Sequence, residues 1–250
     1  MYKMILQSVA LTLTLFSAAF AAASTDDITL VRSLLPAGTD LAQYQLGLLK
    51  KESPADLEEQ VQNNFLFHDF DRDGLRDLIV ISEANPTLFN YDTNQACTDY
   101  DPSDFNNQCR IIPGARTLKI FMGQSDGSLK LIETNDKIVL DADSGGVWGD
   151  PLVGLSLRPT GAVRLDVYGG SSWRWGHTDS FQYRNNHFFV TGQTDVGLHT
   201  LDPDKTFAST DINLITGEKI EERGTHKPVH GHIAVKPLVR LRDFVSPMMK

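Results

Sequence analysis

The chain has 250 residues, of which 32 are acidic and 23 basic, and its formal net charge is −9. A negative surface disfavours binding to nucleic acid and to anionic lipid, and it raises the local concentration of cations such as Ca²⁺. The length suits one domain, or one domain with appendages, with a complete hydrophobic core.

Residues 1–23 predict a cleavable secretory signal peptide. Lys3 is the only charge in this segment, an apolar stretch over residues 4–20 follows it, and small residues allow cleavage after Ala21 or Ala23. A retained membrane anchor is the alternative, but the apolar stretch is short and no basic stop-transfer cluster follows it. The sequence therefore predicts an exported protein, periplasmic or secreted, with no stable membrane insertion after cleavage.

Residues 24–62 form an N-terminal segment with one predicted element. Ser53 and Pro54 suit the N-cap and first turn of a helix, and three acidic residues follow near the positive end of its dipole. We expect a short helix over residues 53–62, and only weak patterning before it.

The remaining residues, 63–250, predict an all-β domain of mainly antiparallel hairpins, propeller-blade-like or sandwich-like. Leu78–Ile81 is a continuous apolar run of the kind found in buried strands. Beyond it, turn residues such as Asp-Gly, Thr-Gly and Asn-Asn separate short apolar segments. The predicted strand pairs are 117–121 with 129–133, 152–157 with 162–168, 180–183 with 188–191, and 211–215 with 218–221, and a last strand is expected within 233–244.

A polar stretch over residues 83–108, rich in Asn and Asp, predicts a long surface loop. Because export places the chain in an oxidising compartment, Cys97 and Cys109 most simply form a disulfide. Such a bond would stabilise the fold by about 3 kcal/mol on the chain-entropy estimate. A second cation site within this stretch is conceivable, although a solvated acidic loop is the simpler interpretation; its carboxylates are Asp99, Asp101 and Asp104.

One short loop carries the clearest chemical pattern in the sequence. Carboxylates occupy its positions 1, 3, 5 and 9, and a glycine at position 6 supplies the unusual dihedral angles of a tight turn. Calcium binds six to eight hard oxygen ligands, and a backbone carbonyl at position 7 would add a neutral one. The predicted calcium ligands are Asp69, Asp71, Asp73, Leu75 and Asp77.

The end of this loop departs from an EF-hand. Val80 stands where an EF-hand has its bidentate glutamate, and a predicted strand follows instead of a helix, so Asp77 is expected to close the coordination sphere. An acidic turn without an ion is the alternative, with only Arg72 and Arg76 nearby to offset the repulsion. Mg²⁺ is less suited, because it gives up its waters reluctantly.

The stretch DFDRDGLRDLIVI, residues 69–81, resembles the calcium loop of FG-GAP (VCBS-type) repeats, as found in integrin α-chain propellers. The wider chain is similar to a group of uncharacterised secreted bacterial proteins with a single such motif, over the stretches GGVWGDPL, YGGSSWRWGHTDSFQYRNNHFFVTG, NLITGEKI and VKPLVRLRDF. The resemblance implies a β fold and secretion, and it implies no reaction. A propeller repeats the calcium motif in successive blades, whereas this chain has one copy.

The segment YGGSSWRWG, residues 168–176, suggests a ligand-binding rim. Trp173, Arg174 and Trp175 are the candidate residues, since aromatic and guanidinium groups provide platforms for a sugar or a peptide. The simpler interpretation is a glycine bend that leads into a strand, with one tryptophan buried.

The same segment also allows a serine nucleophile, Ser171 or Ser172, with His177 and Asp179 nearby. This interpretation is weaker, because a nucleophile elbow needs Gly-x-Ser-x-Gly and the second glycine is missing here.

A histidine group near the C-terminus is the last candidate. His230 and His232 would share one face of a strand and could hold Zn²⁺ or Cu²⁺ together with His226. Pro228 and Gly231 instead favour a mobile polar connection, and no further ligand is identifiable.

These patterns predict a secreted or periplasmic calcium-binding β protein, non-catalytic, whose exposed loops bind a protein or glycan partner. The alternative is a secreted hydrolase with a site near residues 169–175. No Walker loop, zincin motif or dinucleotide fingerprint is present, so we assign no catalytic residue.

Overall fold

The computed structural model describes residues 25–42, 64–90, 93, 95–97 and 109–249. Three of the sequence-based predictions lie outside these residues: the signal peptide, the helix over residues 53–62, and the second acidic cluster, which comprises Asp99, Asp101 and Asp104.

The described residues form three sheets in which every paired strand is antiparallel, which confirms the all-β prediction. The five-stranded sheet has the order β1-β3-β7-β8, with β2 also paired to β3. Its strands are β1 (Thr39–Leu41), β2 (Phe65–His68), β3 (Asp77–Ala84), β7 (Arg116–Gly123) and β8 (Leu129–Asn135).

The seven-stranded sheet follows chain order from β9 to β15, as expected of successive hairpins. All four predicted strand pairs are present in it or in the five-stranded sheet. Its strands are β9 (Leu152–Leu157), β10 (Val163–Gly170), β11 (Trp173–Arg184), β12 (His187–His199), β13 (Ala208–Asn213), β14 (Glu218–Arg223) and β15 (Val229–His232).

Three expectations about elements are wrong. The stretch predicted as one long loop contributes to a small sheet of β4 (Thr87–Asn90), β5 (Gln95–Ala96) and β6 (Cys109–Ile112). The last strand is β15 and precedes residues 233–244, where the short helix η2 (Leu241–Asp243) lies instead. A helix, α2 (Thr25–Leu34), occupies the part of the N-terminal segment that was expected to be weakly patterned. Its apolar residues Ile28 and Val31 are spaced for one buried helix face, a signal that was overlooked.

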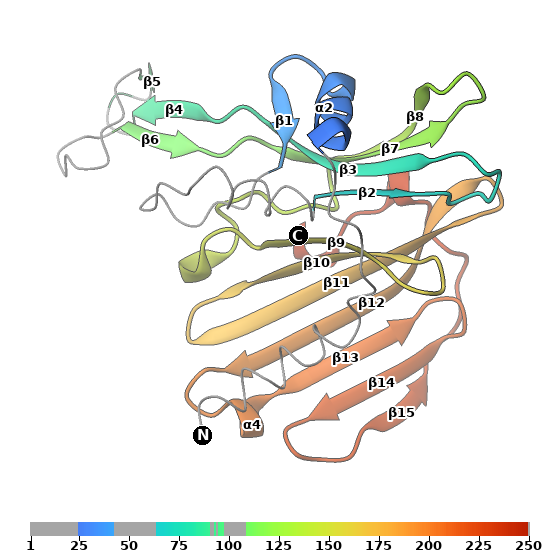
Figure 1. Ribbon diagram of the computed structural model, residues 1–250. Coiled ribbons are helices and arrows are strands. Elements are labelled where there is room, and N and C mark those ends of the chain that lie inside the picture. Colours follow the sequence, from blue (N-terminus) through green and yellow to red (C-terminus); the bar gives the residue numbers. More distant parts are fainter. Residues whose placement is uncertain (1–24, 43–63, 91–92, 94, 98–108, 250) are drawn as a thin grey trace.

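The two larger sheets pack against each other, and α2 covers the outer face of the five-stranded sheet (Figure 1). Strand β3 is buried on both faces, which explains its continuous apolar sequence. Ile79 and Ile81 point into the core between the sheets, while Leu78 and Val80 pack beneath α2. Strands β13 to β15 extend beyond the five-stranded sheet.

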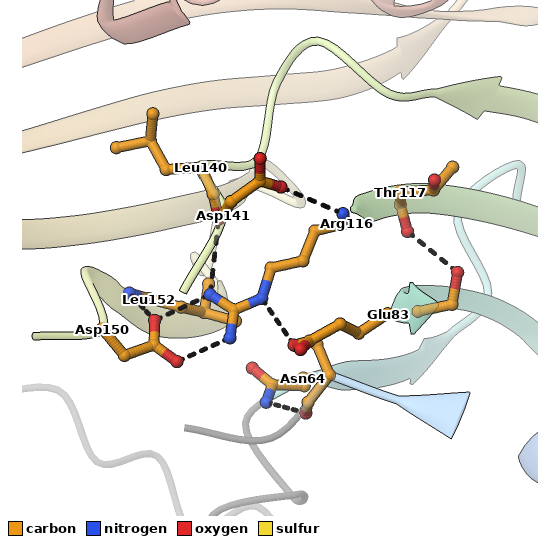
Figure 2. Close-up of polar contacts among 10 residues, drawn as sticks. Asn64, Glu83, Arg116, Thr117, Leu140, Asp141, Asp150 and Leu152 are labelled. Carbon is orange, nitrogen blue, oxygen red and sulfur yellow. Dashed lines mark hydrogen bonds and ion pairs between the residues drawn. The ribbon is translucent and has the colours of Figure 1, made fainter. Parts of the chain in front are cut away.

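A buried ionic network joins the five-stranded sheet to the segment that precedes β9 (Figure 2). The Arg116 guanidinium donates two hydrogen bonds to Asp150, one of 2.7 Å from Nη1, and its Nε donates to Glu83 over 2.9 Å. Burial by itself would lower the pKa of Arg116, but the two carboxylates outweigh that effect and raise it. All three side chains are almost inaccessible to solvent, so the network stabilises the fold only while it is complete.

The C-terminal segment, residues 239–244, forms hydrogen bonds with both of the larger sheets. Val190 donates its backbone N–H to the Val239 carbonyl, and the Asn135 amide donates to the carbonyls of Leu241 and Phe244. Leu241 is buried in the core between the sheets. The remaining short helices are α4 (Pro203–Thr206), η1 (Gly146–Trp148) and η3 (Pro247–Met249).

Candidate metal centre

The aspartate loop is the connection between β2 and β3, which pair so that His68 lies opposite Asp77. Arg72 and Gly74 have positive φ angles of 64° and 88°, which turn the chain tightly. Asp69 accepts two backbone hydrogen bonds, from Asp73 N over 3.1 Å and from Gly74 N over 3.0 Å. The loop is therefore folded around its first carboxylate.

Asp77 is the buried member of the loop, with a relative exposure of 1 %. Its Oδ2 accepts the Phe70 N–H over 2.8 Å, and its Oδ1 accepts the Gly123 N–H over 2.9 Å. Burial raises the pKa of Asp77, and the nearby charges of Asp73 and Asp69 raise it further, while the two backbone hydrogen bonds oppose this. The protein thus holds a carboxylate in a place that disfavours its charge.

Three of the predicted ligands meet in space. Asp69, Asp71 and Asp77 each offer a carboxylate oxygen, and these oxygens lie within 4.8 Å of one another. Burial also raises the pKa of Asp71, with the charges of Asp77 and Asp73 contributing. Asp73 lies outside this group, and its Oδ1 accepts the Leu75 N–H over 2.8 Å. The roles of Asp73 and Leu75 as ligands stay predictions.

The arginines expected to offset this charge do not pair with it. Arg76 forms an ion pair with Asp27 at 2.8 Å and lies 3.6 Å from the centre of the Phe67 ring. Arg72 forms no ion pair with any described residue. The group of three carboxylates therefore has no cationic partner within the described part of the chain. Its all-oxygen donor set fits a hard divalent cation such as Ca²⁺.

Two residues outside the acidic pattern position the loop. Phe70 is buried, and its ring packs edge-on against Phe188 of β12 at 5.5 Å, which ties the loop to the second sheet. Gly123 of β7 lets the loop approach closely, since a Cβ there would lie 2.9 Å from both the Arg76 carbonyl oxygen and the Leu75 Cβ. Sequence reasoning missed Gly123, because a glycine at a strand end has no distinctive pattern until its neighbour in space is known.

A cavity of about 280 Å³ is lined by residues of the loop and of the hairpin turn between β11 and β12. Burial raises the pKa of Tyr183, and the charges of Asp71, Asp77 and Asp73 raise it further. The lining is mainly polar and consists of His68, Asp69, Phe70, Asp71, Arg72, Gly161, Gln182, Tyr183, Arg184, Asn185 and Asn186.

The predicted rim of Trp173, Arg174 and Trp175 is divided between two faces of the sheet, because successive strand residues point in opposite directions. Trp173 is 60 % exposed and contacts His199, and Trp175 packs over Gly169. Neither tryptophan is fully buried.

Arg174 belongs to a different group, on the opposite face. Its guanidinium lies 4.7 Å from the Trp148 ring, which in turn packs edge-on against Tyr168. The three predicted residues therefore do not form one binding surface.

The serine and histidine expected of a hydrolase are not brought together. His177 is buried, its Nδ1 lies 2.6 Å from Asp195 Oδ1, and its Nε2 lies 3.1 Å from Asp179 Oδ1. The serine that hydrogen bonds to Asp179 is the buried Ser246. Among the described residues, no hydrogen bond links His177 to Ser171 or Ser172.

The C-terminal histidines do not form a metal-sized group within the described residues. His230 and His232 are exposed on β15, and His230 Nδ1 lies 3.8 Å from Glu218 Oε1. His226 lies in the turn before that strand.

The cysteines border the small sheet. Cys97 donates its backbone N–H to the Leu88 carbonyl. Cys109 of β6 lies opposite Asn90 of β4. No free thiol is found among the described residues. The side chain of Cys109 is not among them, so the disulfide stays a prediction.

In the part of the chain that is described, no helix is both long enough and apolar enough to cross a bilayer. Compared with models of protein families, with curated proteins and with solved structures, the chain matches none of them. The resemblance to FG-GAP loops therefore stays a prediction.

Proposed function

We propose that this chain is an exported calcium-binding β protein in which one Ca²⁺ stabilises the junction between its sheets. The observation that carries the proposal is the approach of Asp69, Asp71 and Asp77 to within 4.8 Å without a cationic partner among the described residues. Folding forces these carboxylates together, and their repulsion is relieved by a bound cation.

The location of the loop explains how an ion would act on stability. Asp77 is the first residue of β3 and is hydrogen bonded to Gly123 at the end of β7, so it links two strands of one sheet. Phe70 extends from the same loop into the core between the sheets. A rigid loop therefore keeps β2, β3 and β7 in register. This role of the ion affects stability and involves no reaction on a substrate.

Calcium is favoured over magnesium by the number and geometry of the ligands. The candidate site offers several carboxylates on one tightly turning loop, and such loops provide the many oxygens that Ca²⁺ accepts with flexible geometry. Mg²⁺ requires near-octahedral geometry and retains several waters. Extracellular calcium modules often have dissociation constants of about 10⁻⁴–10⁻³ M, so binding should be measured up to millimolar concentrations.

Isothermal titration calorimetry of the EDTA-treated protein with CaCl₂ tests the proposal, together with thermal unfolding in EDTA and in Ca²⁺. We expect one ion per chain and stabilisation of about 2.7 kcal/mol at a hundredfold excess over the dissociation constant. Equal melting temperatures in the two buffers, with no heat of binding, would refute it.

Asp71→Asn gives a sharper test, because the amide removes the charge while its oxygen can still accept the Asp73 N–H. This variant should lose the calcium-dependent rise in melting temperature. In EDTA it should melt no lower than the wild-type protein, since the repulsion of Asp71 by Asp77 and Asp73 has been removed. Asp143→Asn is the matched control, because Asp143 is exposed and distant from the loop in sequence, and it should behave as wild type.

Export and the binding of a protein or glycan partner complete the proposal. The leader-like residues 1–23 support export, and the net charge of −9 disfavours nucleic acid as the partner. A processed N-terminus, determined by mass spectrometry on protein isolated from its native host, should begin after Ala21 or Ala23.

A further inference from the structure

We propose that the cavity beside the aspartate loop binds a small sugar acid of the hexuronate class, with Arg72 and Arg184 holding its carboxylate. This inference rests on the proposed calcium site, because Asp69 and Asp71 line the same cavity. It differs from that proposal because it concerns an organic ligand in the cavity and not the ion itself.

The cavity contains polar groups that the fold itself does not use. Among the described residues, Arg72 and Arg184 make no ion pair or hydrogen bond through their guanidinium groups, although four aspartates lie in the adjacent loop. The Tyr183 hydroxyl and the side-chain amides of Asn185 and Asn186 also have no hydrogen-bond partner there. The arginines and asparagines are exposed to solvent and line one concave space, and small-molecule sites are concave with a few polar groups that orient the ligand.

The framework around these groups is fixed. Asn185 and Asn186 have φ angles of 49° and 63° and form the tight turn between β11 and β12. Gln182 donates its amide to the Thr160 carbonyl over 2.8 Å, which joins this hairpin to the β9–β10 turn. Tyr183 packs against Phe188 in the core, with ring centres 5.2 Å apart. The hairpin turn and the Tyr183 ring are therefore held in place before any ligand arrives.

The charge of the cavity selects the ligand. Arginine binds carboxylates through parallel hydrogen bonds, so two unpaired arginines favour an anion. The loop carboxylates would repel that anion unless a divalent cation neutralises them. Binding of the sugar acid should therefore require Ca²⁺, and a ligand with one negative charge is favoured over a doubly charged phosphate.

The neutral groups and the size define the rest of the ligand. The amides and the phenol both donate and accept hydrogen bonds, which suits the adjacent hydroxyls of a sugar ring. The phenol of a tyrosine is protonated at neutral pH, so the Tyr183 hydroxyl can donate as well as accept. A volume of about 280 Å³ lies at the lower limit for small-molecule pockets, so it fits a ligand smaller than a typical drug.

Calorimetry with galacturonate and glucuronate on the calcium-saturated protein tests the inference. At least one of the two should bind, while galactose, which lacks the carboxylate, and acetate, which lacks the hydroxyls, should bind at least about tenfold more weakly, or 1.4 kcal/mol. Inorganic phosphate is a third comparator. Tighter binding of phosphate, or no binding of either uronate when Ca²⁺ binding is measured in the same sample, would overturn the inference.

Arg184→Gln separates this inference from the calcium site. Arg184 is exposed and lies outside the aspartate loop, so the variant should bind Ca²⁺ as wild type and bind the uronate at least about tenfold more weakly. Arg223→Gln, at an exposed arginine that does not line this cavity, should leave both affinities unchanged. Uronate affinity that is unaffected by Arg184→Gln, or that persists undiminished in EDTA, would contradict the proposal. If the wild-type protein does not bind Ca²⁺ at all, the calcium site itself is refuted.

Discussion

Gly123 donates its backbone N–H to Asp77 Oδ1 over 2.9 Å, and this hydrogen bond joins the aspartate loop to the end of β7. The two residues lie in β3 and β7, and the three strands of the small sheet come between these strands in the sequence. The contact requires a residue without a Cβ, since that atom would lie 2.9 Å from the Arg76 carbonyl oxygen. The geometry of the proposed calcium site therefore depends on a residue that is not a ligand.

Gly123→Ala should weaken calcium binding although it changes no proposed ligand. The methyl group must displace the backbone near Arg76, which moves Asp77, and overpacking of this kind costs about 1–3 kcal/mol. Calorimetry and thermal unfolding in Ca²⁺ measure the two effects. Gly231→Ala is the matched control, because no atom lies within 4 Å of the Cβ position there. Identical calcium affinity in both variants would show that the contact does not support the site.

Arg116→Met should destabilise the protein by about 3–5 kcal/mol, because the buried carboxylates of Glu83 and Asp150 would lose the charge of the Arg116 guanidinium. Arg32→Met is the control, since its ion pair with Asp40 is solvent-exposed and such pairs contribute about 0–1 kcal/mol. Urea unfolding at neutral pH measures both differences. Similar small effects of the two substitutions would mean that the buried network contributes little to stability.

Stability should fall as the pH rises through the titration of His177. Burial alone would lower the pKa of His177, but Asp179 and Asp195 outweigh it and raise the pKa above the ordinary value. The folded protein therefore holds this proton more tightly than the unfolded chain. The resulting stabilisation is complete below about pH 6.5 and disappears as the pH passes the raised folded-state pKa.

Urea unfolding of wild type and His177→Gln between pH 5 and 9 measures this contribution. The stability difference between them should be largest at the acidic end and should shrink as the pH rises. His226→Gln is the control, because His226 is exposed and its replacement should change stability by no more than about 0.5 kcal/mol. A difference for His177→Gln that grows with pH would contradict the assignment.

Cys97 and Cys109 should be bonded in the exported protein. Mass spectrometry without reduction should find two hydrogens fewer than in the reduced chain. Reduction should lower stability by up to about 3 kcal/mol in the chain-entropy treatment. Two free thiols in freshly exported protein would disprove the bond.

Local sequence patterns were sufficient for the hairpins and for most of the acidic loop. The turn residues Asn185 and Asn186 adopt the positive φ angles expected of them, and the apolar run at Leu78–Ile81 lies in a strand buried on both faces. These features depend on neighbours within a few residues, so periodicity and turn chemistry reveal them.

The short strands of the small sheet were not predicted, because their local sequence pattern is weak. Strand β4 and its partners are brief and lie in a polar stretch, so their pairing with one another outweighs their weak local preference.

The amino-acid sequence was enough to predict an antiparallel β protein with one carboxylate loop, because strand alternation, turns and the spacing of aspartates are local properties of the chain. Packing alone decided that Arg76 turns away to Asp27 and that Arg184 and Asp71 line the same cavity. The physical reason is that these contacts depend on which residues the folded chain brings together. Burial and charge act on neighbours in space, and sequence distance does not specify those neighbours.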